Sequence, residues 1–237
     1  MNWKDVSKAK DLEMVRKAVG ELDVNERDER GRTPLMLFLT NRMPIQAIQL
    51  LTEHGADLEA EDKLGDTALK KAVKFKQTEA ILKLIEAGAK LDSPRGILAT
   101  AWNAARSDRK IADLLLETKG AVRLTLTAQE QKIADEVLYE ESLEKMCEKI
   151  RRLNSPVLLQ AVVNDYNWDD GPEPMLCAFE NSAIPEIALL DMYELLEGDY
   201  WLEQDESELQ KTAEGIRWKE LASRLKEKLE QDPELRG

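Results

Sequence analysis

The segment NDYNWDDGPEP at residues 164–174 gathers side chains that could carry chemistry. Asp169, Asp170 and Glu173 could offer carboxylate oxygens to a divalent metal ion, but their spacing matches no calcium-binding loop. The same three carboxylates could instead form an acidic surface that meets a basic partner. The segment therefore predicts no metal site, and it leaves partner binding open as one role for these acids.

The same segment also has the composition of a structural turn. Asn167 can accept backbone N–H bonds, Gly171 can adopt a positive φ, and clusters of Asp, Asn, Gly and Pro are typical of turns. We expect Trp168 to be buried and to anchor the loop in the core, with Tyr166 as a further member of this structural motif. This interpretation is preferred over the partner-binding one.

Residues suited to nucleophilic or metal-dependent catalysis are scarce. His54 is the only histidine, and Cys147 and Cys177 lie 30 residues apart without a CxxC motif, which favours reduced, buried thiols. No glycine-rich phosphate loop or G-x-S-x-G motif occurs. We therefore predict no catalytic residue, no cofactor and no metal. A hydrolase built on paired carboxylates remains an alternative among the 47 acids.

Charge is spread unevenly along the chain, whose net charge is -13. Residues 1–120 hold 21 Lys and Arg against 20 Asp and Glu, whereas residues 121–237 hold 13 against 27. The stretch 153–210 carries 14 acids and no Lys or Arg. Such a surface repels nucleic acid, because phosphate contacts need basic side chains, so we predict a protein partner of basic character.

Length and hydropathy place limits on the protein class. A chain of 237 residues with 43% hydrophobic content can bury a sizeable core. No run of 18 apolar residues occurs, and the first ten residues lack the apolar region of a secretory signal. We therefore expect a cytoplasmic protein without a membrane segment, and the sequence leaves its oligomeric state open.

Two segments of the first half repeat each other. RGRTPLMLFLTNRMPIQAIQLLTEHGADLEAED (30–62) aligns with LGDTALKKAVKFKQTEAILKLIEAGAKLDSP (64–94), so that Gly31 matches Gly65 at a spacing of 34. Each segment carries apolar residues at helical spacing, and neither could bury its apolar stripe alone. A stack of helical repeats is the architecture that such periodicity predicts.

The motifs within the repeats point to one family. GRTPL (31–35) resembles the G-x-TPL helix start of ankyrin repeats, and GADL (55–58) resembles the GADV that closes one of their helices. The more divergent flanks at 12–29 and 97–121 resemble degenerate outer units. The resemblance implies a short ankyrin solenoid of about four units in residues 1–121.

In ankyrin repeats, recognition residues lie on the hairpin tips and the inner helix face. In this sequence the ten residues at those positions have mixed charge and include two apolar side chains, which suits a protein partner, although any single one could be a solvated turn residue. The resemblance carries this role over to Glu29, Arg30, Arg32, Thr40, Asn41, Lys63, Leu64, Asp66, Lys74 and Phe75.

Beyond residue 121 the repeat period ends and the pattern predicts further helices. Thr127 with Glu130 forms a capping-box signature, and Ser155 followed by Pro156 is typical of a helix start. No strand alternation is visible, so the whole chain is predicted to be all-α, with an acidic helical domain at 122–237.

The second half also resembles a known family. Its aromatic-Asn-Trp-Asp-Asp-Gly sequence, at 166–171, is similar to the signature of a small bacterial helical domain of uncharacterised function, over roughly residues 150–205. Together the two halves favour a non-catalytic interaction module. One specific hypothesis is a bacterial immunity or antitoxin-like protein that masks a basic toxin, and a general scaffold or adaptor is the alternative.

Overall fold

The computed structural model describes residues 1–210 and 213–231, and within these ranges every regular element is a helix. This confirms the all-α prediction. The chain divides into two compact units, the first formed by Met1–Ser93 with Ala99–Leu115 and the second by Pro94–Leu98 with Leu116–Gly237. The predicted domain boundary between residues 121 and 122 remains a prediction.

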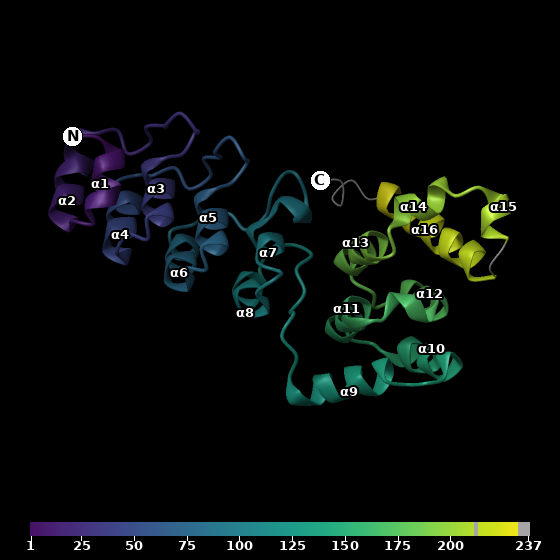
Figure 1. Ribbon diagram of the computed structural model, residues 1–237. Helices are drawn as coiled ribbons and strands as arrows, with labels where there is room; N and C mark the ends of the chain where they lie inside the picture. Colours follow the sequence, from purple (N-terminus) through teal and green to yellow (C-terminus); the bar gives the residue numbers. More distant parts are fainter. Residues whose placement is uncertain (211–212, 232–237) are drawn as a thin grey trace. The chain divides into compact units, whose positions relative to one another are not determined.

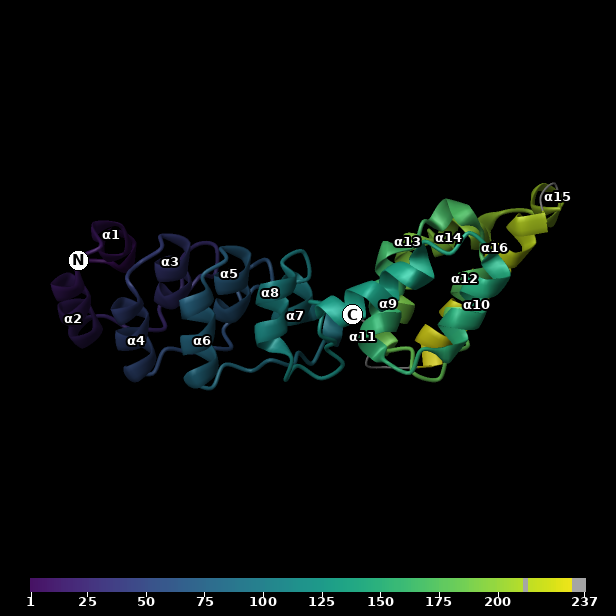
Figure 2. The ribbon, with the colours of Figure 1, turned by 90° about the horizontal axis from the view of Figure 1, so that it is seen from below.

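The first unit is a stack of antiparallel helix pairs. Helices α1, α3 and α5 lie in one row and α2, α4 and α6 in a second row, and each packs on the next member of its own row (Figure 2). The stack has four pairs, as the sequence predicted. Its helices are α1 (Trp3–Ala9), α2 (Leu12–Glu21), α3 (Pro34–Thr40), α4 (Ile45–Glu53), α5 (Ala68–Lys74), α6 (Thr78–Glu86), α7 (Ala101–Ala104) and α8 (Arg109–Ala112), followed by the short 3₁₀ turn η2 (Asp113–Leu115). A second 3₁₀ turn, η1 (Ile97–Ala99), lies where the chain passes from one unit to the other.

Threonine caps start the first helix of three successive pairs. Thr33, Thr67 and Thr100 each precede a helix, and each side chain accepts the backbone N–H three residues later. Pro34 follows the first of these caps, at the first helical position. A backbone N–H there would have no acceptor within the helix, so proline costs the helix no hydrogen bond. The cap fixes where each helix begins and so keeps successive pairs in register.

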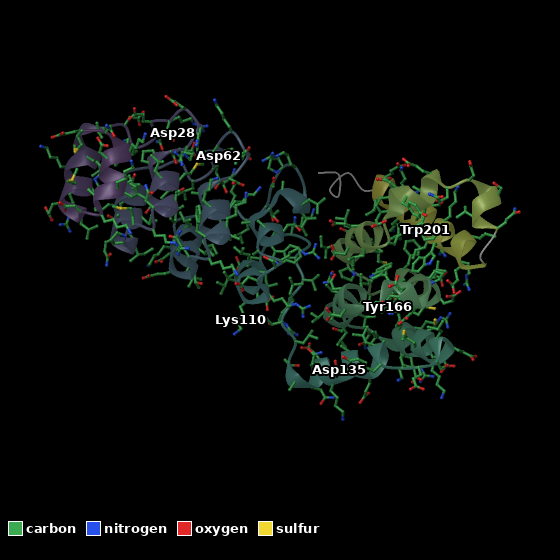
Figure 3. All side chains as sticks on the ribbon, viewed as in Figure 1. Asp28, Asp62, Lys110, Asp135, Tyr166 and Trp201 are labelled. Carbon is green, nitrogen blue, oxygen red and sulfur yellow. The ribbon has the colours of Figure 1, made fainter. Side chains whose placement is uncertain are left out.

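Aspartates at equivalent repeat positions build the hairpins between the pairs. Asp28 and Asp62 each accept the backbone N–H groups two and four residues later, at 2.9 and 2.9 Å for Asp28 and at 2.9 and 3.0 Å for Asp62. Figure 3 marks both aspartates. The backbone N–H of Lys63 then donates to the carbonyl of Arg30 at 3.0 Å, which joins adjacent hairpins. Gly31 sits at this contact with φ of 75°.

Apolar side chains between neighbouring pairs form the core of the first unit. Trp3 meets Phe38 edge to face at 5.8 Å between ring centroids. The largest side chains that are completely buried in this unit are Leu35, Met36, Phe38, Leu39, Ile48, Leu51, Leu69, Ile81, Leu84, Trp102 and Leu115. Each pair therefore completes the core of its neighbours.

The second unit consists of helices that follow one another with short connections (Figure 1). The capping box of Thr127 and Glu130 and the cap at Ser155 are both present as predicted. The elements are α9 (Ala128–Leu138), α10 (Leu143–Arg152), α11 (Pro156–Asp165), η3 (Trp168–Asp170), α12 (Glu173–Phe179), α13 (Glu186–Leu195), α14 (Gly198–Glu203), α15 (Glu206–Leu209) and α16 (Ala213–Gln231).

Helix α16 closes the core of the second unit. It packs against α12, α13 and α14, and it contributes Trp218, Leu221, Ala222 and Leu225 to one apolar cluster. Cys147 and Cys177 are buried free thiols within the same cluster, in line with the sequence prediction. Burial raises the pKa of Cys147 to about 12, with the Cys177 side chain as a further cause.

We expect three Gly→Ala substitutions to separate the cost of a positive φ from the cost of a steric clash at the contact between hairpins. Gly31 has a positive φ, and a Cβ there would lie 3.3 Å from the Lys63 backbone nitrogen, whereas Gly55 has a positive φ of 82° and open space. Gly31→Ala should lower the free energy of unfolding by about 2 kcal/mol and Gly55→Ala by about 1 kcal/mol.

Gly20 serves as the control, because it lies within α2 and a Cβ there would meet nothing. Gly20→Ala should raise the free energy of unfolding by about 0.5 kcal/mol. Urea unfolding of the three variants, followed by circular dichroism, measures the series. Equal losses at Gly31 and Gly55 would contradict a cost from the hairpin contact.

Candidate functional site

Four of the proposed recognition residues are exposed at adjacent hairpin tips. Glu29 and Arg30 lie on one tip, and Lys63 and Leu64 lie on the next, with the Leu64 side chain 80% exposed. The backbone bond between the two tips holds the four side chains near one another. An exposed leucine among mixed charges is a surface that a protein partner could bury.

Asp66 does not behave as the sequence analysis expected. Its side chain is buried, and it accepts hydrogen bonds from Lys71 at 2.8 Å and Lys74 at 2.6 Å. Lys71 also pairs with Asp62 at 2.7 Å. Burial opposes ionisation of Asp66, but the hydrogen bonds from the two lysines outweigh it and lower its pKa. Asp66 and Lys74 therefore support the hairpin and α5, and Asp66 is not available to a partner.

The remaining recognition residues are half-buried. The Arg32 guanidinium binds the Asp28 carboxylate at 2.7 Å, so this side chain supports its own hairpin. The Thr40 hydroxyl donates to a carbonyl of its own helix, and the Asn41 amide donates to a hydroxyl on α1. Phe75 is partly covered. These four contribute more to the shape of the stack than to an open surface.

The 164–174 segment forms a tight turn between α11 and α12. The buried Tyr166 hydroxyl donates to the Gly171 carbonyl at 2.8 Å. Asn167 caps η3, and Gly171 has φ of 101°. Burial raises the pKa of Tyr166, and the charges of nearby carboxylates raise it further, so its hydroxyl stays a donor. The turn interpretation of these three residues agrees with this geometry.

Trp168 is only partly buried, which corrects the expectation that it anchors the loop from within the core. Its indole N–H donates to the Val163 carbonyl at 3.3 Å, and its ring meets Tyr166 edge to face at 5.9 Å. On another side the ring lies 5.9 Å from Trp218. Tyr166 holds the turn, while part of Trp168 stays open because it lines a pocket.

The three proposed partner-binding carboxylates of this turn differ in their surroundings. Asp169 and Asp170 are exposed, whereas Glu173 is half-buried and pairs with Arg217 of α16 at 2.6 Å. Glu173 is therefore partly neutralised by Arg217, which makes it less available to a basic partner than Asp169 and Asp170. The absence of Lys and Arg from residues 153–210 does not reveal this ion pair, because Arg217 lies 44 residues after Glu173 in the chain.

Much of the acidic stretch nevertheless stays unneutralised. Arg224 and Lys226 of α16 lie within ion-pair distance of Glu180 and Asp199. Within the described residues, a further six exposed acids have no Lys or Arg partner. They are Asp169, Asp170, Glu194, Glu197, Glu203 and Asp205.

A pocket of about 440 Å³ opens beside Trp168. Aromatic rings of three elements line it, with Trp168 from η3, Tyr200 and Trp201 from α14, and Trp218 from α16. Trp201 is marked in Figure 3. The carboxylate residues Asp169, Glu197 and Glu214 complete the lining together with two leucines at the end of α13.

Sequence reasoning missed this pocket. Three of the five tryptophans fall between residues 168 and 218, and one of them follows a tyrosine in an acidic stretch, which was the available signal. Nothing in the spacing indicates that the Trp218 ring contacts those of Trp168 and Trp201, because the contacts depend on how α16 packs. Only the tertiary structure brings the rings together.

Within residues 1–210 and 213–231, no group of three or more His, Cys, Asp or Glu is placed to hold a metal ion. No helix in these ranges combines the length and the apolar character needed to cross a bilayer.

Two family models match separate parts of the chain. The family model "Ankyrin repeats (3 copies)" matches residues 5–95. Residues 5–95 are ankyrin repeats. A second family model, the domain of unknown function DUF4274, matches residues 154–230. Both sequence resemblances are thereby confirmed.

Part of the chain is also similar to part of a curated protein. An intracellular phospholipase A2 from Caenorhabditis elegans is 33% identical over 96 residues, which is 35% of this chain and 9% of the relative. The chain thus spans less than a tenth of that relative. Ankyrin repeats support binding to a protein partner in general. The side chains at residues 29–30 and 63–64 are exposed on the hairpin tips.

We expect the buried Asp66 to make the stability of the ankyrin unit depend on pH. Its pKa is lowered on folding, so its contribution is fully present above pH 4, near the unfolded value, and is lost as the pH falls through the folded value. Asp66→Asn should lower the free energy of unfolding by about 2 kcal/mol at pH 7.

Urea unfolding of wild type and Asp66→Asn at several pH values between 7 and 3 measures this effect. The difference between the two proteins should shrink below pH 4. A difference that stays constant over the whole range would show that the carboxylate charge is not the cause.

A second expectation concerns the turn in the DUF4274 half. Tyr166→Phe removes the hydroxyl that donates to Gly171 and should lower the free energy of unfolding by about 1 kcal/mol, because a buried carbonyl loses its partner. Tyr139→Phe is the matched control, since the Tyr139 side chain is 82% exposed, and it should change nothing. Thermal unfolding compares the two, and equal midpoints would show that the hydroxyl does not hold the turn.

Proposed function

We propose that this chain is a non-catalytic protein-binding module that recognises a basic protein, and more specifically that it acts as an immunity or antitoxin-like inhibitor. The observation that carries the proposal is the set of exposed carboxylates without cation partners in the described part of the second unit. Their charge would attract a basic partner, and the bound inhibitor would then cover the partner's nucleic-acid site. Nucleic acid itself would be repelled by the same surface.

The ankyrin hairpin tips support the protein-binding part of the proposal. Arg30, Lys63 and Leu64 offer hydrogen-bond donors next to an apolar side chain, which is the composition of an interface centre and its rim. A general scaffold or adaptor would use the same tips. The unpaired acids support the inhibitor role over the adaptor role, because an adaptor needs no preference for a basic partner.

The hydrolase alternative has less support. The match to the phospholipase covers only 9% of that protein, so its activity gives no reason to assign lipid hydrolysis here. Carboxylates do line the pocket beside Trp168, but they lie among rings that favour binding of a cation. We therefore propose binding rather than catalysis.

Charge reversal tests the proposal. Asp169→Lys combined with Asp170→Lys should slow association with the partner by about tenfold at low salt and remove most of the salt dependence, because both side chains are exposed and unpaired. Affinity capture from cells of the source organism identifies the partner, and surface plasmon resonance with the purified pair measures the rates. Glu173 is left unchanged, since its reversal would break the pair with Arg217.

Glu53→Lys combined with Glu79→Lys is the control of equal charge change, because both acids are exposed on the second helices of ankyrin pairs. It should leave association nearly unchanged. Lys63→Glu with Leu64→Ala should instead speed dissociation, if the hairpin tips lie in the desolvated part of the interface. Capture of an acidic partner, or equal rates for both charge-reversed proteins, would reject the proposal.

A further inference from the structure

We infer that the pocket formed by Trp168, Tyr200, Trp201 and Trp218 binds a guanidinium group, namely the side chain of an arginine on the protein partner. This inference rests on the proposed function for the source of the arginine. The chemistry of the pocket stands by itself, and a defined probe can test it without the partner.

The rings of the pocket are arranged as a partial stack. Trp218 contacts both Trp168 and Trp201, with centroid distances of 5.9 and 6.2 Å and interplanar angles of 31° and 23°. Trp218 itself is buried, so the rings open to a ligand are those of Trp168, Tyr200 and Trp201, which Trp218 supports from the core. Tyr200 meets Trp201 edge to face at 5.3 Å. Aromatic faces carry negative potential, and tryptophan provides the strongest attraction for a cation near its ring.

The polar part of the lining has one sign of charge. Asp169, Glu197 and Glu214 are exposed carboxylate residues at the pocket, and no Lys or Arg lines it among the described residues. No salt bridge in the described part of the chain neutralises these three acids. Rings and carboxylates therefore favour the same kind of ligand, a cation, and both disfavour an anion.

Guanidinium fits this combination better than other cations. It is planar and weakly hydrated, so it can stack on an indole ring at low desolvation cost, whereas the ammonium of lysine is compact and strongly hydrated. Its N–H groups can also donate to carboxylates such as Asp169 and Glu197, which a quaternary ammonium cannot do. The volume of about 440 Å³ lies in the usual range for small-ligand pockets, so an arginine head group has room to enter.

Close packing at the start of α14 positions the side of the pocket that Tyr200 and Trp201 form. Gly198 packs so closely on Tyr193 that a Cβ would lie 2.3 Å from its ring. The Tyr193 hydroxyl in turn donates to Asp199 at 2.5 Å. This close approach sets the position of α14, which carries Tyr200 and Trp201. The pocket wall is thus fixed by packing within the second unit.

The test uses Nα-acetyl-arginine N-methylamide as the probe on the full chain. Its neutral citrulline counterpart has nearly the same shape, and choline represents a free quaternary amine. The readout is the indole N–H signals of the five tryptophans in ¹H–¹⁵N spectra. We expect the Trp168, Trp201 and Trp218 signals to shift with a dissociation constant on the order of 1 mM for the arginine probe, while Trp3 and Trp102 of the ankyrin unit stay unchanged.

Two variants assign the binding to this pocket. Trp201→Leu should weaken the arginine probe at least about tenfold, because it removes a stacking surface. Glu197→Gln, a change at an exposed position, should weaken it about threefold and keeps the test valid if the tryptophan variant does not fold. Glu53→Gln is the matched control and should bind like wild type.

Three outcomes would overturn the inference. Equal binding of the citrulline probe would show that charge is not recognised, and tighter binding of choline would assign the pocket to a quaternary amine. Absence of shifts up to about 20 mM of the arginine probe would exclude a guanidinium site. Each of these results comes from small probes without a partner, so it is read separately from the capture of a basic partner, even though Asp169 belongs to both the pocket and the exposed acids.

Discussion

Burial of one apolar stripe per helix between neighbouring helix pairs is the constraint on which the ankyrin unit depends. Leu35, Phe38 and Leu51 of one pair and Leu69 and Leu84 of the next have almost no exposed surface, and none of these pairs could bury them alone. Because this packing sets the positions of the helices, it also restricts the conformation of the hairpins that connect them. The side chains open to a partner are those that neither the core nor the turns require.

The polar side chains of the hairpins follow from the same constraint. A tight turn leaves backbone N–H groups without helical partners, and Asp28 and Asp62 accept them at equivalent positions. Lys71 then lies between Asp62 and Asp66, which makes the inner side of one hairpin a buried ionic cluster. Such a cluster is stabilising only when every member is paired, and it takes Asp66 away from recognition.

In the second unit one helix determines both charge and site. The apolar face of α16 supplies Leu221 and Leu225 to the core, and its polar face carries Arg217 and Arg224 to carboxylates of α12 and the residue that follows it. The same helix places Trp218 against two other indoles. Residues 153–210, which contain no Lys or Arg, thus have some carboxylates paired with α16 and others exposed and unpaired. The unpaired ones include the acids beside the pocket.

The sequence by itself determined the 34-residue period, because the repeated motif is visible in it. It also determined the helical class, the caps at Thr127 and Ser155 and the turn at Asn167 and Gly171, because these depend on neighbours a few residues away. It could not decide that Asp66 is buried, that Glu173 is paired or that three tryptophans share one pocket. For Glu173 and the pocket, the deciding partners lie in separate helices, and packing of the apolar core brings them together. For Asp66, the lysines are close in sequence, but its burial depends on how the hairpin packs on the stack. Only the tertiary structure fixes such contacts, since the free energy that selects them comes from burial over the whole unit rather than from any local pattern.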